Sequence, residues 1–280
     1  MNEINCNVCP HQCHLKEGQT GYCTARAHPA NKSMKDAHRF GSISSNYGEV
    51  TALALDPIEK KPLKNFMPGS FILSVGSWGC NMKCPWCQND SISRGRCRHI
   101  VMTPEELLEK ALESKNNIGI AYTYNEPLIG YEFVRDTAKL IKEAGLKNVL
   151  VSNGMASEEV FHEVLPYLDA MNIDLKTINA QKYQKIGGDL ETILNNIRAA
   201  NKTAHVELTT LIVPGFNDDE EEMKQLSATV AEIDPKIPLH VTRFFPAGEM
   251  WDAKPTPLET LFRMVDIAKQ SLEYVYPGNV

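Results

Sequence analysis

The sequence predicts an α/β protein built from parallel βα units, preceded by a small cysteine-rich module. From residue 71 onward, short apolar runs typical of strands alternate with amphipathic segments typical of helices. All eight cysteines fall between residues 6 and 97. A chain of 280 residues with 42% hydrophobic content suits one sizeable domain with an appendage.

Composition narrows the classes of partner. The formal net charge of -6 argues against a broad surface for nucleic acid or anionic lipid. The sequence has no apolar run of about 18 residues, and its first residues lack the pattern of a signal peptide. We therefore expect a cytoplasmic protein without membrane contact, in which clustered cysteines indicate metal ligands rather than disulfides.

The predicted elements fall into four parts. Residues 1–45 show little apolar periodicity, so their order is expected to depend on a bound metal. Residues 46–70 contain Pro57, Pro62 and Pro68, which predicts an extended connector on the surface of the core domain. Residues 71–247 form that core. Residues 248–280 predict a C-terminal helix followed by a short strand or tail.

Within the core, six apolar runs predict strands, at residues 71–75, 118–124, 148–152, 170–174, 205–213 and 238–244. A helix start is indicated at Thr103, where a cap, a proline and a glutamate stand at the required spacing. Such βα units form an open sheet or a barrel, and both place ligands at the carboxyl ends of the strands. Those strand ends are where we expect the site.

The strongest chemical signal is a C-x3-C-x2-C loop formed by Cys80, Cys84 and Cys87, directly after the first strand. Thiolates select zinc or iron–sulfur clusters, and a cubane cluster needs four ligands. Three protein ligands leave one iron open for a cofactor or substrate. The alternative is a structural zinc site completed by Cys97 or His99.

This loop, with aromatic Trp86 before its last cysteine, resembles the signature of radical S-adenosylmethionine (SAM) enzymes. The resemblance implies a partial (β/α)6 radical SAM barrel in which Cys80, Cys84 and Cys87 bind a [4Fe-4S] cluster. It also implies that SAM chelates the fourth iron, with Trp86 beside the adenine.

Further strand ends match the same family. Asn125 and Glu126 stand where relatives carry a Gly-Gly-Glu-Pro-like motif that holds the methionine ammonium, although the glycines are replaced here. Without the cysteine loop, Glu126 would be better explained as an ordinary glutamate of a first helical turn. The resemblance assigns further cofactor contacts after the third and fourth strands, to Ser152, Asn153, Asp174 and Lys176.

Other assignments have structural alternatives. Asp174 and Lys176 point the same way on a strand and can form an ion pair. His240 and Arg243, at the end of the sixth strand, can touch cofactor or substrate, but single residues of this kind are more often structural. The stretch Pro214-Gly215-Phe216-Asn217-Asp218 resembles the family's motif near the adenine.

Four N-terminal cysteines form a second predicted metal site. Cys6, Cys9, Cys13 and Cys23 have a C-x2-C-x3-C-x9-C spacing, which fits an all-thiolate zinc site or an auxiliary iron–sulfur cluster. Zinc is the preferred interpretation.

Other residues near the two cysteine sets have weaker assignments. His11 and His14 lie among the N-terminal cysteines and can substitute as ligands or have no metal role. Cys97 is expected to be a plain thiol.

The wider pattern resembles the radical enzyme of the AmmeMemoRadiSam system, a subfamily related to pyruvate formate-lyase activating enzymes. It includes the four N-terminal cysteines, the run Asp56-Pro57-Ile58-Glu59-Lys60-Lys61-Pro62-Leu63 and the closing Tyr276-Pro277-Gly278-Asn279-Val280. The resemblance implies an anaerobic oxidoreductase that receives an electron from flavodoxin or ferredoxin and makes a 5′-deoxyadenosyl radical.

The sequence leaves the radical's target open. It is a glycine of a partner enzyme, or else a small molecule or another macromolecule. A non-catalytic zinc-binding module is the remaining alternative.

Overall fold

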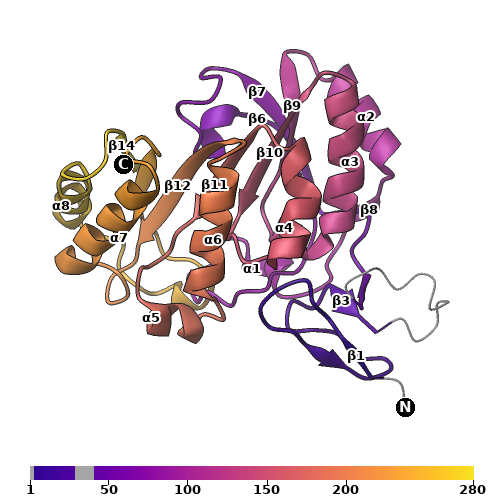
Figure 1. Ribbon diagram of the computed structural model, residues 1–280, viewed down its shortest axis with the longest axis horizontal. Coiled ribbons are helices and arrows are strands. Elements are labelled where there is room, and N and C mark those ends of the chain that lie inside the picture. Colours follow the sequence, from indigo (N-terminus) through magenta and orange to yellow (C-terminus); the bar gives the residue numbers. More distant parts are fainter. Residues whose placement is uncertain (1–2, 29–40) are drawn as a thin grey trace.

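An eight-stranded sheet organises the chain, in the order β14-β13-β12-β11-β10-β9-β7-β6 (Figure 1). The computed structural model describes residues 3–28 and 41–280, so part of the predicted module 1–45 lies outside the described residues. The sheet strands are β6 (Ala52–Pro57), β7 (Phe71–Gly76), β9 (Asn117–Tyr122), β10 (Lys147–Ser152), β11 (Ala170–Asp174), β12 (His205–Ile212), β13 (Leu239–Arg243) and β14 (Val275–Gly278).

The longer helices cover the outer face of this curved sheet, and α1 (Asp90–Ser93) and α5 (Ala180–Lys185) lie at its end (Figure 1). The longer helices are α2 (Pro104–Glu113), α3 (Tyr131–Glu143), α4 (Glu158–Val164), α6 (Leu190–Ala200), α7 (Glu220–Ile233) and α8 (Leu258–Ala268). Short 3-10 turns are η2 (Ile58–Lys60), η3 (Pro127–Gly130), η4 (Leu165–Tyr167) and η5 (Gly248–Met250). The predicted start of α2 is confirmed, because Thr103 and Glu106 form a reciprocal capping box.

The predicted α/β class is confirmed, and the sheet is wider than the six expected strands. All neighbours from β7 to β14 pair in parallel. Strand β6 adds to the other edge, antiparallel to β7. The prolines of residues 46–70 had indicated only a connector, so this pairing was not foreseen. Pro57 ends β6 at the sheet edge, where a missing N–H donor costs no ladder bond.

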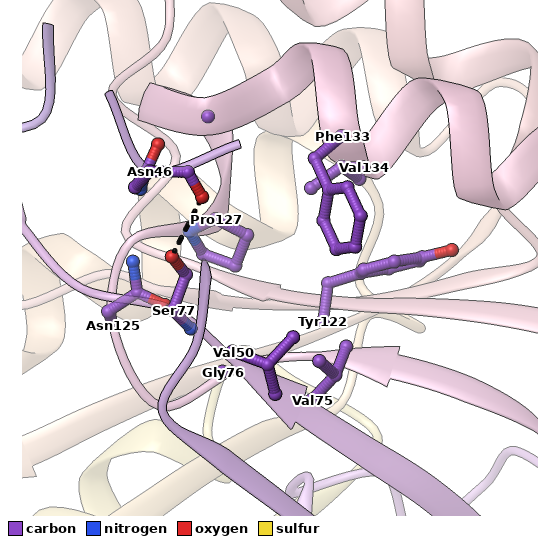
Figure 2. Close-up of a pocket in the computed structure, with 11 residues that line it drawn as sticks. Asn46, Val50, Val75, Gly76, Ser77, Tyr122, Asn125, Pro127, Phe133 and Val134 are labelled. Carbon is purple, nitrogen blue, oxygen red and sulfur yellow. Dashed lines mark hydrogen bonds between the residues drawn. The ribbon is translucent and has the colours of Figure 1, made fainter. Parts of the chain in front are cut away.

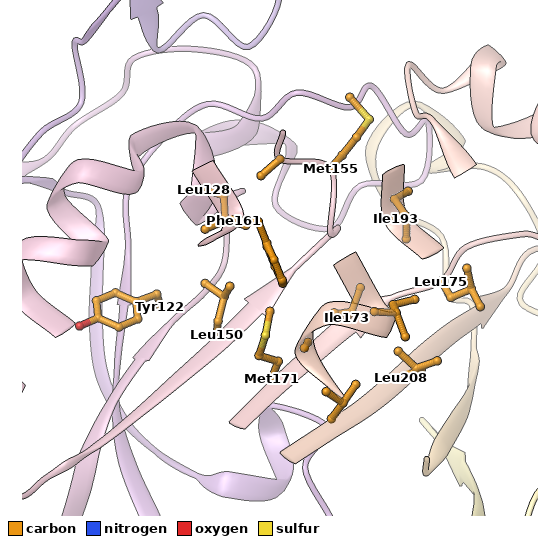
Figure 3. Close-up of a cluster of buried hydrophobic side chains, with 14 of the residues drawn as sticks. Tyr122, Leu128, Leu150, Met155, Phe161, Met171, Ile173, Leu175, Ile193 and Leu208 are labelled. Atoms are coloured by element: carbon orange, nitrogen blue, oxygen red, sulfur yellow. The ribbon is translucent and has the colours of Figure 1, made fainter. Parts of the chain in front are cut away.

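Two layers of apolar side chains pack against the sheet. On the outer face, Leu150, Met171 and Ile173 of the strands pack with Phe161 of α4 and Ile193 of α6 (Figure 3). These strands are buried on both faces, which is why their sequences are nearly continuous apolar runs.

On the inner face, Ile58 and Leu63 from the segment after β6 form a second cluster with Ala121, Val149 and Ala170. The small alanines leave room for this inserted segment. This segment therefore fills part of the inside of the sheet.

The N-terminal region consists of short antiparallel pairs beside the sheet end where α1 lies (Figure 1). The pairs are β1 (Ile4–Asn5) with β2 (His14–Leu15), β3 (Arg26–Ala27) with β4 (Ile43–Ser44), and β5 (Glu49–Val50) with β8 (Ile100–Val101).

A buried ion pair fastens this region to the core, with Arg26 Nη1 2.8 Å from Glu132 Oε2 of α3. Both side chains are almost completely buried. None of the helices in the described part of the chain combines the length and the hydrophobicity that a membrane crossing requires.

Candidate active site

A cavity of about 490 Å³ opens on the inner face of the sheet at the carboxyl ends of the strands. This volume lies within the range of small-molecule and cofactor sites. Its lining residues come from the cysteine loop, from the ends of β9 to β13, from the segment after β6 and from the C-terminal tail. They are Lys60, Lys61, Pro62, Cys80, Met82, Cys84, Trp86, Cys87, Gln88, Asn89, Ser93, Thr123, Tyr124, Asn125, Glu126, Val151, Ser152, Asn153, Asp174, Lys176, Thr209, Leu211, Thr242 and Asn279.

The three loop cysteines all line this cavity. Asn125 holds the loop in place: its Oδ1 accepts from Ser77 N at 2.9 Å, and its Nδ2 donates to the Gly79 carbonyl at 3.1 Å. Gly79 has φ 88°, and a Cβ there would lie 2.7 Å from the Cys23 carbonyl oxygen. The loop is thus fixed between the end of β9 and the N-terminal region.

The donor set fits a thiolate-bound cluster. Burial raises the pKa of Cys80 and of Cys84 above the ordinary value for a thiol. Neighbouring negative charge from Glu126 adds to this effect at Cys80. Ionised thiols at such positions require a cationic partner, which a metal supplies. Three ligands on one side of an open cavity leave room for a further ligand from outside the protein.

Glu126 lies at the end of β9 and is almost completely buried. Its carboxylate accepts from Ser152 Oγ at 2.8 Å, from Asn153 N at 2.8 Å and from Leu128 N at 3.0 Å. Burial raises the pKa of Glu126 to about 7 despite these donors. A cation in the cavity would stabilise the ionised carboxylate. The structure therefore brings Glu126, Ser152 and Asn153 together, although the three were assigned from different strand ends.

Asp174 and Lys176 also meet at the cavity wall, with Lys176 Nζ 2.8 Å from Asp174 Oδ2. Burial alone would lower the pKa of Lys176, but Asp174 and Cys84 raise it overall. The sequence allowed either this ion pair or a cofactor contact. The two residues form the pair and also line the cavity. Trp86 packs against Phe216, with ring centroids 4.5 Å apart, so an aromatic wall adjoins the cysteines.

His240 and Arg243 do not line the cavity. His240 points inward at the base, and its Nε2 lies 2.6 Å from Glu207 Oε2. Arg243 donates from Nε to the Thr256 carbonyl at 2.7 Å. Thr242 is the residue of β13 that lines the cavity. Alternation along the strand turns the adjacent Arg243 to the other face, whereas His240 lies deeper on the same face.

Several lining residues carried no assignment from the sequence. Lys60, Lys61, Tyr124, Thr242 and Asn279 belong to this group. Lys60, Lys61 and Asn279 belong to runs that matched the subfamily pattern, but the match gave these residues no function. Lining residues follow both edge strands in sequence, with Lys60, Lys61 and Pro62 after β6 and Asn279 after β14.

A much smaller gap of about 30 Å³ lies behind the cavity, between β7, β9 and α3 (Figure 2). Val50, Val75, Tyr122 and Phe133 make most of it apolar. Its volume is enough for a water molecule but not for a cofactor. Asn125 lines both spaces.

The four N-terminal cysteines lie outside the cavity. Cys6, Cys9 and Cys23 are buried, and Cys13 is partly exposed. Burial and, to a smaller extent, the neighbouring Cys23 and Cys6 raise the pKa of Cys9 to about 12. Within residues 3–28 and 41–280, no three His, Cys, Asp or Glu side chains are gathered in an arrangement that would hold a metal ion as they stand.

Other residues near the two cysteine sets also have defined places. His11 Nε2 lies 2.8 Å from the Asn81 carbonyl oxygen, which links this region to the loop of Cys80. Cys97 is partly exposed and packs at the edge of a small cluster with Trp78 and Ile129.

The fold and the site together define a class of protein: a parallel α/β barrel with three thiols on one cavity at the strand ends. Comparison with known proteins identifies the family. Residues 76–227 match the model of the radical SAM superfamily. The chain belongs to that superfamily, whose members hold a [4Fe-4S] cluster and SAM.

Individual relatives agree. The chain is 40% identical to the uncharacterized protein MJ0808 of Methanocaldococcus jannaschii, over 100% of this chain and 82% of the relative. It is 26% identical to pyruvate formate-lyase 1-activating enzyme of Escherichia coli, over 69% and 86% of the two chains. The fold also matches a radical SAM methyltransferase from Sphaerobacter thermophilus, with a TM-score of 0.59, 14% identity and coverage of 76% and 67%.

Proposed function

We propose that this chain reductively cleaves SAM at a [4Fe-4S] cluster held by Cys80, Cys84 and Cys87. The observation that carries the proposal is the convergence of three thiols and the Glu126 carboxylate on one cavity. When bound, the cluster and SAM supply an electron and a 5′-deoxyadenosyl radical for hydrogen abstraction. The chain is then an oxidoreductase.

The chain's own residues position the cofactor in this proposal. The buried Glu126 pairs with the methionine ammonium, and Lys176 pairs with the carboxylate. Asp174, Ser152, Asn153 and Asn125 complete the polar wall, and Trp86 with Phe216 provides an apolar surface for the adenine. His240 and Arg243, which lie off the cavity, act on this site only through the residues they support.

The N-terminal cysteines form a second metal site in this proposal, holding zinc or an auxiliary cluster. The division into a module at 1–45, a connector at 46–70, a barrel core at 71–247 and a C-terminal part at 248–280 belongs to the same proposal. The buried contact between Arg26 and Glu132 makes the module a fixed part of the protein.

For the substrate, we propose hydrogen abstraction from a glycine of a partner enzyme. Likeness to pyruvate formate-lyase 1-activating enzyme over 86% of that relative supports it. The alternative is a small molecule held within the lined cavity. The cysteine pattern supports a place in the AmmeMemoRadiSam subfamily, with flavodoxin or ferredoxin as electron donor in an anaerobic cytoplasm.

Anaerobic purification tests the central proposal. The protein should be brown, with about four irons and four sulfides at the loop. With SAM and dithionite it should release 5′-deoxyadenosine and methionine. Protein that takes up two zinc ions and no iron after anaerobic reconstitution would overturn the proposal.

A further inference from the structure

The cavity contains a second charged group, at its floor. Lys60, Lys61 and Tyr124 line the cavity there. Because β6 is antiparallel to β7 and Pro57 pairs with Phe71, η2 and the two lysines lie at the amino end of the parallel strands. The cysteine loop follows the carboxyl end of β7. Tyr124 follows the carboxyl end of β9 beside Gly76, and its hydroxyl reaches Asp56. The charged group therefore extends from the amino end of the strands to the end that carries the cysteine loop.

Asp56 joins the members of this floor group. Its carboxylate lies 3.2 Å from Lys60 Nζ and 2.9 Å from Lys61 Nζ, and it accepts from Tyr124 Oη at 2.8 Å. Burial opposes its ionisation, but the bonds from Lys61 and Tyr124 hold the pKa of Asp56 below its usual range. Burial and the Asp56 bond raise the pKa of Tyr124 to about 12. One carboxylate thus faces two ammonium groups and a neutral phenol, which leaves one positive charge in excess.

Lys61 has hydrogen-bonding capacity to spare. Its side chain is only 3% exposed, and in the described part of the chain its ammonium makes one hydrogen bond, to Asp56. An ammonium carries three donors, and buried donors in folded proteins are normally paired. Since Lys61 lines the cavity, its remaining donors are available to a group bound there.

The backbone of Tyr124 is unfavourable for a tyrosine. Its φ is 72°, in the left-handed region that favours glycine. The ring fits only because residue 76 is a glycine, since a Cβ at Gly76 would lie 2.8 Å from Tyr124 Cδ2. Strained residues of this kind cluster at functional sites. A phenol thus lines the cavity at a position where the backbone conformation would favour glycine.

The excess charge at the floor is not offset by Asp174, because that carboxylate is already paired with Lys176. We propose that Lys60 and Lys61 bind an oxyanion of the substrate, a carboxylate or a phosphate, with Asp56 and Tyr124 positioning Lys61. The bound anion holds the substrate in the same cavity that the three cysteines line. This inference rests on the proposed function, because it assigns the remainder of the same cavity.

Anion binding to the reconstituted, SAM-loaded protein tests the floor site. SAM is included so that its carboxylate already occupies its own position and the added anion does not bind there. Radiolabelled inorganic phosphate and acetate are measured separately by equilibrium dialysis. We expect saturable binding of one anion per chain. Tighter binding of phosphate would indicate a substrate that bears a phosphate, and tighter binding of acetate would indicate a substrate that bears a carboxylate. Lys61→Met should weaken binding at least tenfold.

Lys60→Met is the second variant. Because the Lys60 side chain is 67% exposed, replacing it should leave the protein folded. It should weaken binding at least fivefold. Lys110→Met, which alters an exposed lysine on α2, is the matched control and should bind as the wild type does. Normal binding in both Lys60→Met and Lys61→Met would overturn the inference.

The wild-type protein separates this inference from the proposed function. Wild-type protein that cleaves SAM with dithionite but binds neither anion would overturn the floor site and leave the proposed function standing. Wild-type protein that binds phosphate at the lysines but cannot cleave SAM would overturn the proposed function instead.

Discussion

The two cysteine sets have the same ligand chemistry and different surroundings. Cys80, Cys84 and Cys87 line a large cavity beside a buried carboxylate and an ion pair. Cys6, Cys9 and Cys23 are buried in a region of two-residue strands and do not reach that cavity. A catalytic metal site needs an open coordination position, whereas a structural site closes all of them. The proposed catalytic and structural roles of the two cysteine sets therefore differ in whether the site is open to a cavity, and not in the type of ligand.

The largest expected effect comes from removing one thiol from each set. Cys84→Ala should abolish the loop cluster and all SAM cleavage, because two remaining thiols cannot hold a cubane. Cys9→Ala should keep roughly four irons and cleave SAM with dithionite. Iron analysis and 5′-deoxyadenosine release measure both variants. Loss of all iron in Cys9→Ala would show that the two sites are one unit.

A second variant tests how firmly the N-terminal region is fixed to the barrel. Arg26→Met removes the guanidinium from the buried ion pair with Glu132, which should destabilise the protein by about 3–5 kcal/mol. Chemical denaturation measures the loss, and limited proteolysis locates it. The double variant Arg26→Met/Glu132→Leu should recover most of the stability. A single variant as stable as the wild type would mean that the region is independent of the barrel.

A smaller effect separates cofactor binding from cluster assembly at the open site. Glu126→Gln removes a charge proposed to pair with the ammonium of SAM, a bond worth about 1.5–3 kcal/mol. SAM should bind roughly tenfold to a hundredfold more weakly, with unchanged cluster absorbance. The exposed Glu113→Gln serves as the control. Normal affinity and normal cleavage in Glu126→Gln would contradict the assignment.

The smallest expected effect concerns Glu207 of β12, which accepts hydrogen bonds from the backbone N–H groups of Lys64 and Asn65 in the segment after β6. Burial opposes the ionisation of Glu207, but bonds from His205, His240 and the backbone of Lys64 and Asn65 lower the pKa of Glu207 to about 2. A carboxyl with a depressed pKa stabilises the fold above its unfolded value, about 4.5. That contribution is lost as pH falls through about 2.

Glu207→Gln should therefore unfold with less dependence on pH in this acid range, and it should be less stable at neutral pH by about 1–3 kcal/mol. Denaturation curves at several pH values measure the difference. The same acid dependence in wild type and variant would show that Glu207 does not hold the segment after β6 in place.

The sequence predicted the barrel because its strands are buried on both faces and its helices are amphipathic, and both patterns are periodic along the chain. It predicted the cysteine loop because three ligands lie within eight residues. The edge strand β6 was missed, since prolines mark turns and edges alike and only pairing with β7 distinguishes them.

What the sequence alone determined about this protein is its local chemistry: the thiol spacing, the helix start at Thr103 and the alternating elements. Tertiary structure decided which distant residues meet. Glu126 joins Ser152 and Asn153 because adjacent parallel strands end together. Lys61 reaches the cavity only because the segment after β6 folds inside the sheet. His240 and Thr242 stand two residues apart on β13, and only Thr242 of the two lines the cavity. Both point to the same face of the sheet, so the alternation of the strand cannot distinguish them. Their depth within the barrel depends on how the whole sheet is packed.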